Sequence, residues 1–293
     1  FDSVANQTVS ATTTDNDVAG FTLVQTSGST SVNESGTTDT FTVVLNAQPT
    51  SNVVLTVTSS DTGEATVNSP LTFTPANWDT PQTVTVTGVN DGSVVDGNQT
   101  STVTVSVNDG SSNDSFDPLA DQTVSVTTTD NDVPGFTVAE SGGSTSVNES
   151  GTTDTFTVVL NAQPTSDVLF SLTASDATEA SVTSSLTFTP ANWNTAQTAT
   201  VTGLNESTVD GDQTSVITIS IVDAVSNDSF DPVADQTVSV TTVDNDTAGF
   251  TVVQSGGSTS VSEAGTTDTF TVVLNAQPIS DVVLTITSSD TGE

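Results

Sequence analysis

The sequence contains no lysine, arginine or histidine, and it also lacks cysteine, tyrosine and methionine. Aspartate and glutamate together number 36, so the formal net charge is −36. A chain without cationic side chains cannot bind nucleic-acid phosphates and is poorly suited to anionic lipid. The absence of thiols and imidazoles disfavours zinc and copper sites and excludes disulfides, which leaves the redox compartment open. The partners that suit this charge are inorganic cations or basic surfaces.

Hydrophobic residues are also scarce, at 32% of the chain, and the mean hydropathy is −0.05. No apolar run approaches the ~18 residues that a membrane-spanning helix requires, so the sequence predicts no membrane insertion. The Val, Phe, Ile and Leu residues nevertheless follow a period of two, which is typical of half-buried strands and is not explained by disorder.

The chain repeats itself at a long interval. The tripeptide Asp-Asn-Asp begins at Asp15, Asp130 and Asp244, with intervals of 115 and 114 residues, and Trp78 recurs as Trp193. A period of this length equals one small all-β domain rather than one turn of a solenoid. We therefore expect a C-terminal strand of a preceding module in 1–17, complete modules in 18–132 and 133–246, and the N-terminal strands of a further module in 247–293. These partial modules lead us to expect a piece of a longer array.

The first complete repeat contains seven β-branched segments bounded by turn-forming residues. They cover residues 21–24, 40–45, 53–58, 65–67 leading into 71–73, 83–87, 102–107 and 123–127. Their alternation predicts an all-β chain of tandem seven-stranded antiparallel β-sandwich modules of immunoglobulin-like type, joined end to end.

The topology of such a sandwich places alternate loops at opposite ends. The first loop (33–36), the third (60–64), the fifth (90–97) and the exit from the last strand (130–132) should therefore meet at one pole. We expect their carboxylates, and those of the second and third copies, to be the metal ligands: Glu34, Asp61, Glu64, Asp91, Asp96, Asp130, Asp132; Glu149, Asp176, Glu179, Glu206, Asp210, Asp244, Asp246; Glu263 and Asp290.

Carboxylates crowded at one pole repel each other, and this chain has no cation of its own to neutralise them. Oxygen-only ligands suit a hard cation, and Ca²⁺ takes six to eight of them in flexible geometry. The sequence therefore predicts a Ca²⁺ site in each module, facing the next module. The alternative is that these Asp, Asn and Gly residues only form turns.

The order of motifs resembles Calx-beta repeats: Val-x-Glu-x-Gly, an acidic loop, Leu-Thr-Phe-Thr-Pro, a second acidic loop and a closing Asp-Asn-Asp. The resemblance covers essentially the whole chain and implies calcium-binding β-sandwich modules. It implies ligand roles for Glu34, Asp61, Asp91, Asp96, Asp130 and Asp132. The fifth loop carries fewer acids than is usual in that family, and the triplet has Asn131 at its centre, which implies fewer or weaker sites. The near-identity of the copies is similar to the arrays of large bacterial adhesins and extracellular fibres.

Catalysis is not expected. The triplet Asp61-Thr62-Gly63 matches the aspartic-protease motif, but the second copy reads Asp176-Ala177-Thr178, and no side chain is present to assist paired carboxylates. Trp78 and Trp193 could stack on carbohydrate, although capping the end of the core is the better explanation.

The sequence thus predicts a non-enzymatic extracellular or cell-surface protein, a Ca²⁺-stiffened spacer or fibre shaft. Its expected partners are calcium ions, neighbouring modules and other copies of the chain. Two alternatives remain open at this point: an adhesin that binds a glycan or protein ligand, and a self-assembling filament subunit.

Overall fold

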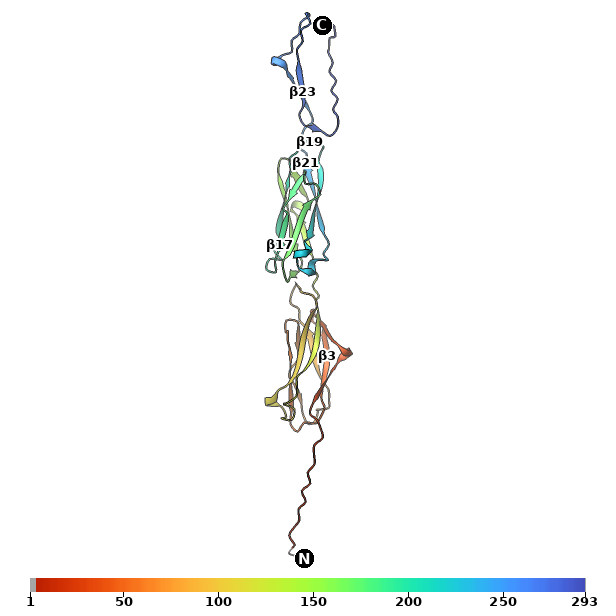
Figure 1. The fold of residues 1–293 in the computed structure, drawn as a ribbon, viewed down its shortest axis with the longest axis vertical. Coiled ribbons are helices and arrows are strands. Elements are labelled where there is room, and N and C mark those ends of the chain that lie inside the picture. The colour runs from red at the N-terminus through yellow and green to blue at the C-terminus, as the bar shows by residue number, and fades with distance from the viewer. Residues whose placement is uncertain (1–3, 293) are drawn as a thin grey trace. The chain divides into compact units, whose positions relative to one another are not determined.

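The computed structural model describes residues 4–292 (Figure 1). They divide into two compact units, with the boundary between Asp132 and Val133. Among the described residues, regular structure consists of strands and single-turn 3-10 helices. None of these helices has the length and apolar character needed to cross a membrane.

The first unit contains two facing sheets. One sheet has the order β1 (Phe21–Gln25), β3 (Thr38–Leu45), β7 (Gln82–Gly88), β5 (Ala65–Val67). The other has the order β2 (Thr30–Asn33), β10 (Gln122–Thr129), β9 (Gln99–Val107), β4 (Val53–Ser59), β6 (Leu71–Phe73). The remaining elements of this unit are β8 (Val94–Val95), η1 (Thr26–Gly28) and η2 (Asp109–Ser111).

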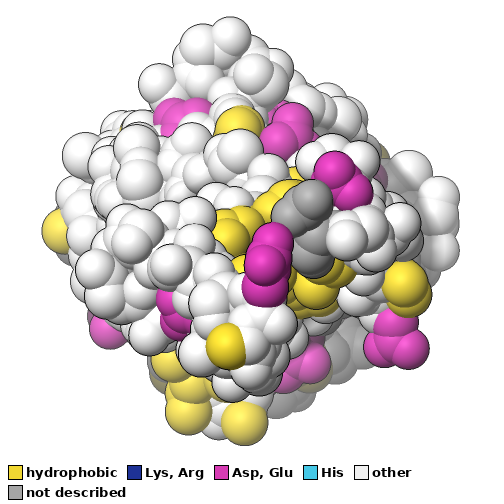
Figure 2. Space-filling model, turned by 90° about the horizontal axis from the view of Figure 1, so that it is seen from above, with side chains coloured by type: hydrophobic (Ala, Val, Ile, Leu, Met, Phe, Trp, Pro, Cys, Tyr) yellow, Lys and Arg dark blue, Asp and Glu magenta, His cyan; other side chains and the backbone are white. Residues whose placement is uncertain are grey.

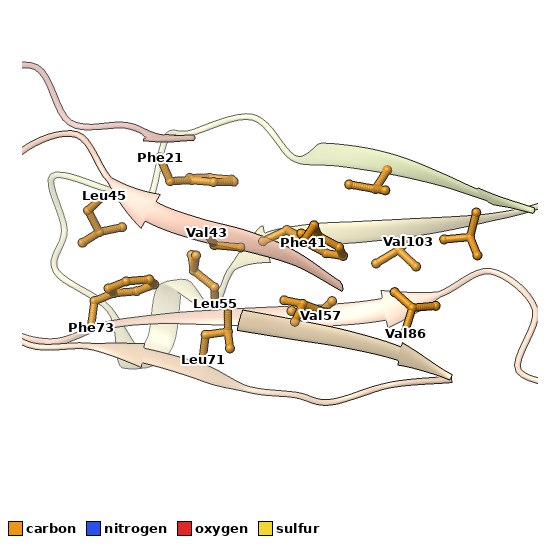
Figure 3. Packing of buried hydrophobic residues seen from close by; sticks show 14 of the residues in the cluster. Phe21, Phe41, Val43, Leu45, Leu55, Val57, Leu71, Phe73, Val86 and Val103 are labelled. Atoms are coloured by element: carbon orange, nitrogen blue, oxygen red, sulfur yellow. The ribbon is translucent and has the colours of Figure 1, made fainter. Parts of the chain in front are cut away.

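The hydrophobic core lies between these two sheets (Figure 3). Phe41 and Val86 project from one sheet and Leu55 and Val103 from the other, and all four are fully buried. Alternate residues such as Thr42 and Thr104 face outward and are only half-buried. The period-two pattern of Val and Thr therefore builds the sandwich directly, because successive side chains of a strand point to opposite faces.

The second unit repeats this arrangement. Its sheets have the orders β11 (Phe136–Glu140), β13 (Thr153–Leu160), β18 (Gln197–Gly203), β16 (Ala180–Val182), and β12 (Thr145–Asn148), β21 (Gln236–Val243), β20 (Gln213–Ile221), β15 (Val168–Ala174), β17 (Ser185–Phe188). It also contains β14 (Gln163–Pro164), β19 (Thr208–Val209), η3 (Ser141–Gly143), η4 (Asp223–Val225) and η5 (Asp228–Phe230). The prediction of an all-β chain of similar sandwiches is confirmed.

The strands differ from the prediction in two places. The first predicted strand, 21–24, is β1, which pairs antiparallel with β3, whereas β2 was not predicted and pairs in parallel with β10. The fourth becomes β5, which pairs with β7, and β6, which pairs with β4. The parallel β2–β10 pair departs from the expected all-antiparallel sheets, and it has a direct consequence for the acidic pole described below.

The terminal segments are less regular. Residues 4–17 are exposed and form no strand, and residues 1–3 of the segment expected there lie outside the described residues. After the second sandwich come β22 (Phe250–Gln254), η6 (Ser255–Gly257), β23 (Phe270–Leu274) and β24 (Gln277–Pro278). β22 pairs antiparallel with β23, and β24 pairs in parallel with β19. The division into modules at 17, 132 and 246 stays a prediction.

Trp78 lies half-buried against the core of the first sandwich, and its carbonyl accepts a hydrogen bond from the Leu45 amide at 3.2 Å. The Trp193 carbonyl accepts the corresponding bond from Leu160 at 3.2 Å. This packing favours the capping role over a carbohydrate platform.

Candidate metal centre

The parallel pairing of β2 with β10 brings Glu34 to the Asp-Asn-Asp triplet. Asn33 lies opposite Thr129 at the carboxyl ends of the two strands. The Glu34 amide donates to the Thr129 carbonyl at 3.3 Å, and the Asn131 amide donates to Glu34 Oε2 at 3.3 Å. Because parallel strands end at the same edge, the loop after β2 and the chain after β10 meet at one place.

A close backbone approach adds the third segment. A Cβ atom at Gly88 would lie 2.2 Å from the Asn33 carbonyl oxygen, and one at Gly203 would lie 2.3 Å from the Asn148 oxygen. Only glycine allows this separation, since no side-chain carbon fits there. Gly88 ends β7, so the contact brings the loop that carries Asp91 and Asp96 close to Glu34.

The fourth segment carries Glu64, which precedes β5. Its carbonyl accepts hydrogen bonds from the Val89 amide at 2.9 Å and from Thr128 Oγ1 at 3.3 Å. These bonds tie Glu64 to the ends of β7 and β10. Four segments that are far apart in sequence thus converge on one end of the sandwich.

Carboxylate oxygens approach within 4.8 Å of one another in three groups. The first repeat contains Glu34, Asp91 and Asp132 in one group and Glu64, Asp91 and Asp96 in another. The second repeat contains Glu149, Glu206 and Asp246. At this separation each pair of charges repels by roughly 1 kcal/mol in water and by more in a partly buried site.

Two glutamates at this end of each sandwich are buried. Glu34 and Glu149 are each 1% exposed, Glu64 is 8% exposed and Glu179 is 6% exposed. Each has one buried carboxylate oxygen without a hydrogen-bond partner. The same is true of Asp96, Asp132, Glu206, Asp210 and Asp246. Buried carboxylate oxygens normally have partners, because leaving one unsatisfied is costly.

Burial and mutual repulsion shift these groups toward their neutral forms. Burial raises the pKa of Glu34 to about 7. The hydrogen bond from the Asn131 amide opposes this shift, and the negative charges of Asp130, Asp91 and Asp96 add to it. Burial and the charge of Asp96 raise the pKa of Glu64. Burial likewise raises the pKa of Asp91, Asp96, Asp132, Glu149 and Glu179. A bound cation would reverse this preference, since it stabilises the ionised carboxylates.

The other expected ligands lie outside the three groups. Asp130 uses both carboxylate oxygens to hold the backbone, accepting from the Asp132 amide at 2.7 Å and from the Gly97 amide at 2.8 Å. Asp244 does the same with Asp246 and Gly211, at 2.7 and 2.8 Å. These two aspartates position the chain around the candidate centre.

Asp61 and Asp176 are exposed and stabilise their own turns. Asp61 Oδ1 accepts from the Gly63 amide at 2.9 Å. Asp176 Oδ1 accepts from the amide and the hydroxyl of Thr178, at 2.9 and 2.6 Å, and these bonds lower the pKa of Asp176. Glu263 and Asp290 are exposed as well and belong to none of the three groups.

Asp117 was not among the expected ligands, but it also has a buried carboxylate oxygen without a hydrogen-bond partner. Asp117 follows β9 and η2, and the unpaired oxygen is Oδ1. Burial and the charges of Asp109 and Asp114 raise its pKa. The side chain of Asp117 is only half-buried. The sequence did not distinguish Asp117 from a turn residue, because it lies in a loop rich in Asp and Asn.

The donor set fits a hard divalent cation. Oxygen is the only ligand type present, the buried oxygens point to a missing partner, and no Lys, Arg or His exists to supply one. On the face drawn in Figure 2, Asp and Glu lie among uncharged side chains and no cationic side chain appears. Glu34, Asp91 and Asp132, and their equivalents in the second repeat, could hold a cation such as Ca²⁺, which takes oxygen ligands only.

Comparisons with known proteins identify no family for the chain: no protein-family model matches it, and no curated protein matches it. Among solved structures it is similar to the calcium binding domain CBD12 of CALX1.1, with 15% identity, 68% of this chain and 80% of that chain covered, and a TM-score of 0.27. It is also similar to domains 4 and 5 of the S-layer protein SbsC, with 20% identity, 64% and 76% covered, and a TM-score of 0.29. At these scores neither likeness assigns a function to this chain.

Proposed function

We propose that this chain is a non-catalytic structural protein, a spacer or fibre shaft at a cell surface or in extracellular matrix, whose modules bind Ca²⁺ at their acidic poles and are stiffened by it. The observation that carries the proposal is the burial of Glu34 and Glu149, each with a carboxylate oxygen that lacks a partner and faces other acids. The same buried, unpaired glutamate oxygen occurs in both complete repeats, so it is a feature of the module.

The order of acidic motifs supports calcium as the ion. Val-x-Glu-x-Gly and the closing Asp-Asn-Asp resemble Calx-beta repeats, and these two motifs contain Glu34 and Asp132. Mg²⁺ suits the pole less well, because it demands near-ideal octahedral geometry and releases its water reluctantly.

A contact in the second unit supports the stiffening. The Glu206 carboxylate belongs to a candidate metal group, and the carbonyl of the next residue, Ser207, accepts a hydrogen bond from the Gln277 amide at 2.8 Å. Thr208 and Val209 then pair in parallel with Gln277 and Pro278. An ion that immobilises Glu206 would therefore also immobilise the segment that contacts the following repeat.

A structural role also agrees with the chemistry of the pole. Paired carboxylates could act as acid and base, but the chain has no His, Lys, Arg, Cys or Tyr to assist them. A repeated charge cluster with a bound ion is better suited to holding segments together.

Electron microscopy of the chain in Ca²⁺ and after removal of Ca²⁺ tests this function. We expect particles with a narrow distribution of end-to-end distances in Ca²⁺ and a broad distribution without it. Equal distributions in both conditions would contradict the stiffening role, and lateral assembly in Ca²⁺ would instead indicate a filament subunit.

A further inference from the structure

Asp91 belongs to both acidic groups of the first repeat. Its carboxylate lies within 4.8 Å of ligand oxygens of Glu34 and Asp132 in one group and of Glu64 and Asp96 in the other. A carboxylate has two oxygens, so one aspartate can join two cations. The first repeat therefore offers two adjoining sets of ligands with one residue in common.

Each set contains a buried carboxylate that marks it as more than a patch of surface acids. Glu34 is 1% exposed and its Oε1 has no partner; Glu64 is 8% exposed and its Oε2 has no partner. Asp132 Oδ2 in the first set and Asp96 Oδ1 in the second are likewise buried and unpaired. Both sets thus lack a positive partner.

The second repeat differs at the position of Asp91. Glu206 replaces it, and the loop is one residue shorter because it has no counterpart of Gly92. Glu206 Oε2 accepts a hydrogen bond from the Thr208 amide at 2.9 Å, which leaves Oε1 for the group with Glu149 and Asp246. The shorter loop therefore uses one oxygen of the glutamate for its own turn.

The second set has no complete counterpart in this repeat. Glu179 and Asp210 each have a buried oxygen without a partner, but within residues 4–292 they form no group of three with a further acid. The second repeat therefore offers two ligand residues here, Glu179 and Asp210, whereas the first repeat offers three.

We propose that the two complete repeats hold different numbers of Ca²⁺ ions: two in the first, joined by Asp91, and one in the second, held by Glu149, Glu206 and Asp246. This inference rests on the proposed function, since it assumes that the acidic poles bind Ca²⁺. The length of one loop then sets the calcium capacity of a module while its fold stays the same.

Native mass spectrometry of the full chain in Ca²⁺ tests the proposal through two matched substitutions. We expect Asp91→Asn to lower the number of bound ions by two and Glu206→Gln to lower it by one, while Asp79→Asn, at an exposed turn, leaves it unchanged. An equal loss in the two variants would overturn the unequal capacity but leave calcium binding intact. A wild-type chain that binds no ion would refute the proposed function itself.

A second pair of substitutions tests the same proposal in case a variant of the first pair does not fold. Glu64→Gln should lose one ion and Glu179→Gln none, because only Glu64 belongs to a complete group. Circular dichroism identifies any variant that fails to fold. Equal losses in this second pair would also overturn the proposal.

Discussion

The Asn131 amide donates a hydrogen bond of 3.3 Å to the Glu34 carboxylate, joining residues that lie 97 positions apart in the sequence. In the second repeat, Asn245 and Glu149 make the same contact at 3.1 Å. The bond satisfies Oε2 of each glutamate and leaves Oε1 buried without a partner. The triplet that marks each repeat is therefore part of the acidic pole, and its central asparagine acts through its backbone.

Replacing Glu34 by glutamine should separate stability from calcium binding. Glutamine keeps an acceptor for the Asn131 amide but removes a buried charge that Asp91 and Asp132 repel. We expect the Ca²⁺-free protein to melt at the same or a higher temperature, and the stabilisation by Ca²⁺ to fall. A site that is lost at a ligand concentration of 100 times Kd forfeits about 2.7 kcal/mol.

Thermal unfolding with and without Ca²⁺ measures both effects, and Asp79→Asn is the matched control because it removes one exposed charge elsewhere. If Glu34→Gln retained the full stabilisation by Ca²⁺, Glu34 would not be a ligand.

Replacing Gly88 by alanine should destabilise the first sandwich. The new methyl group would lie 2.2 Å from the Asn33 carbonyl oxygen, so the end of β2 would have to move away from β7. Steric insertions of this kind cost about 1–3 kcal/mol. We expect Ca²⁺ affinity to fall as well, because Glu34 follows Asn33 directly.

Gly110→Ala provides the comparison, since no atom lies within 4 Å of the position that its new methyl group would occupy. Chemical denaturation with calcium titration of both variants checks the prediction. Equal behaviour of the two would show that the close approach at Gly88 does not position the pole.

The stability of the Ca²⁺-free protein should fall as the pH rises. Folding raises the pKa of Glu34 from 4.5 to about 7, so the folded state binds a proton more tightly than the unfolded state. Glu34 therefore contributes stability that is fully present below pH 4.5 and lost as the pH rises to about 7. The raised pKa values of Glu64 and Glu149 act in the same direction.

Saturating Ca²⁺ should reverse this trend, because the ligands must be deprotonated to bind the ion. Melting temperatures measured from pH 4.5 to 7.5 in metal-free buffer and in Ca²⁺ test the sign. Parallel curves in the two buffers would mean that the ion does not compete with these protons.

The alternation of Val and Thr, as in residues 102–107, was enough to predict the two-layer core and most of the strands, although β2 and β8 were missed. Assigning alternate loops to opposite ends correctly brought Glu34, Glu64 and Asp91 to one pole. The parallel pairing of β2 with β10 was not predictable. The segment Thr30–Asn33 has only four residues, and its sequence does not indicate that it pairs with a strand almost 100 residues later.

The different uses of identical aspartates were also hidden from the sequence. Asp91 and Asp130 are the same residue type at the same pole, yet Asp130 is bound to two backbone amides whereas Asp91 lies in two acidic groups. Local backbone geometry over a few ångströms decides between these roles, and the residue types around the two aspartates do not reveal it.

Calorimetric titration of the full chain with Ca²⁺ in metal-free buffer at pH 7.5 measures directly whether the acidic poles bind the ion. We expect saturable binding to both complete repeats, release of protons from the buried glutamates and a rise in melting temperature. No heat of binding together with an unchanged melting temperature would contradict it, and would assign the acidic residues to turns alone.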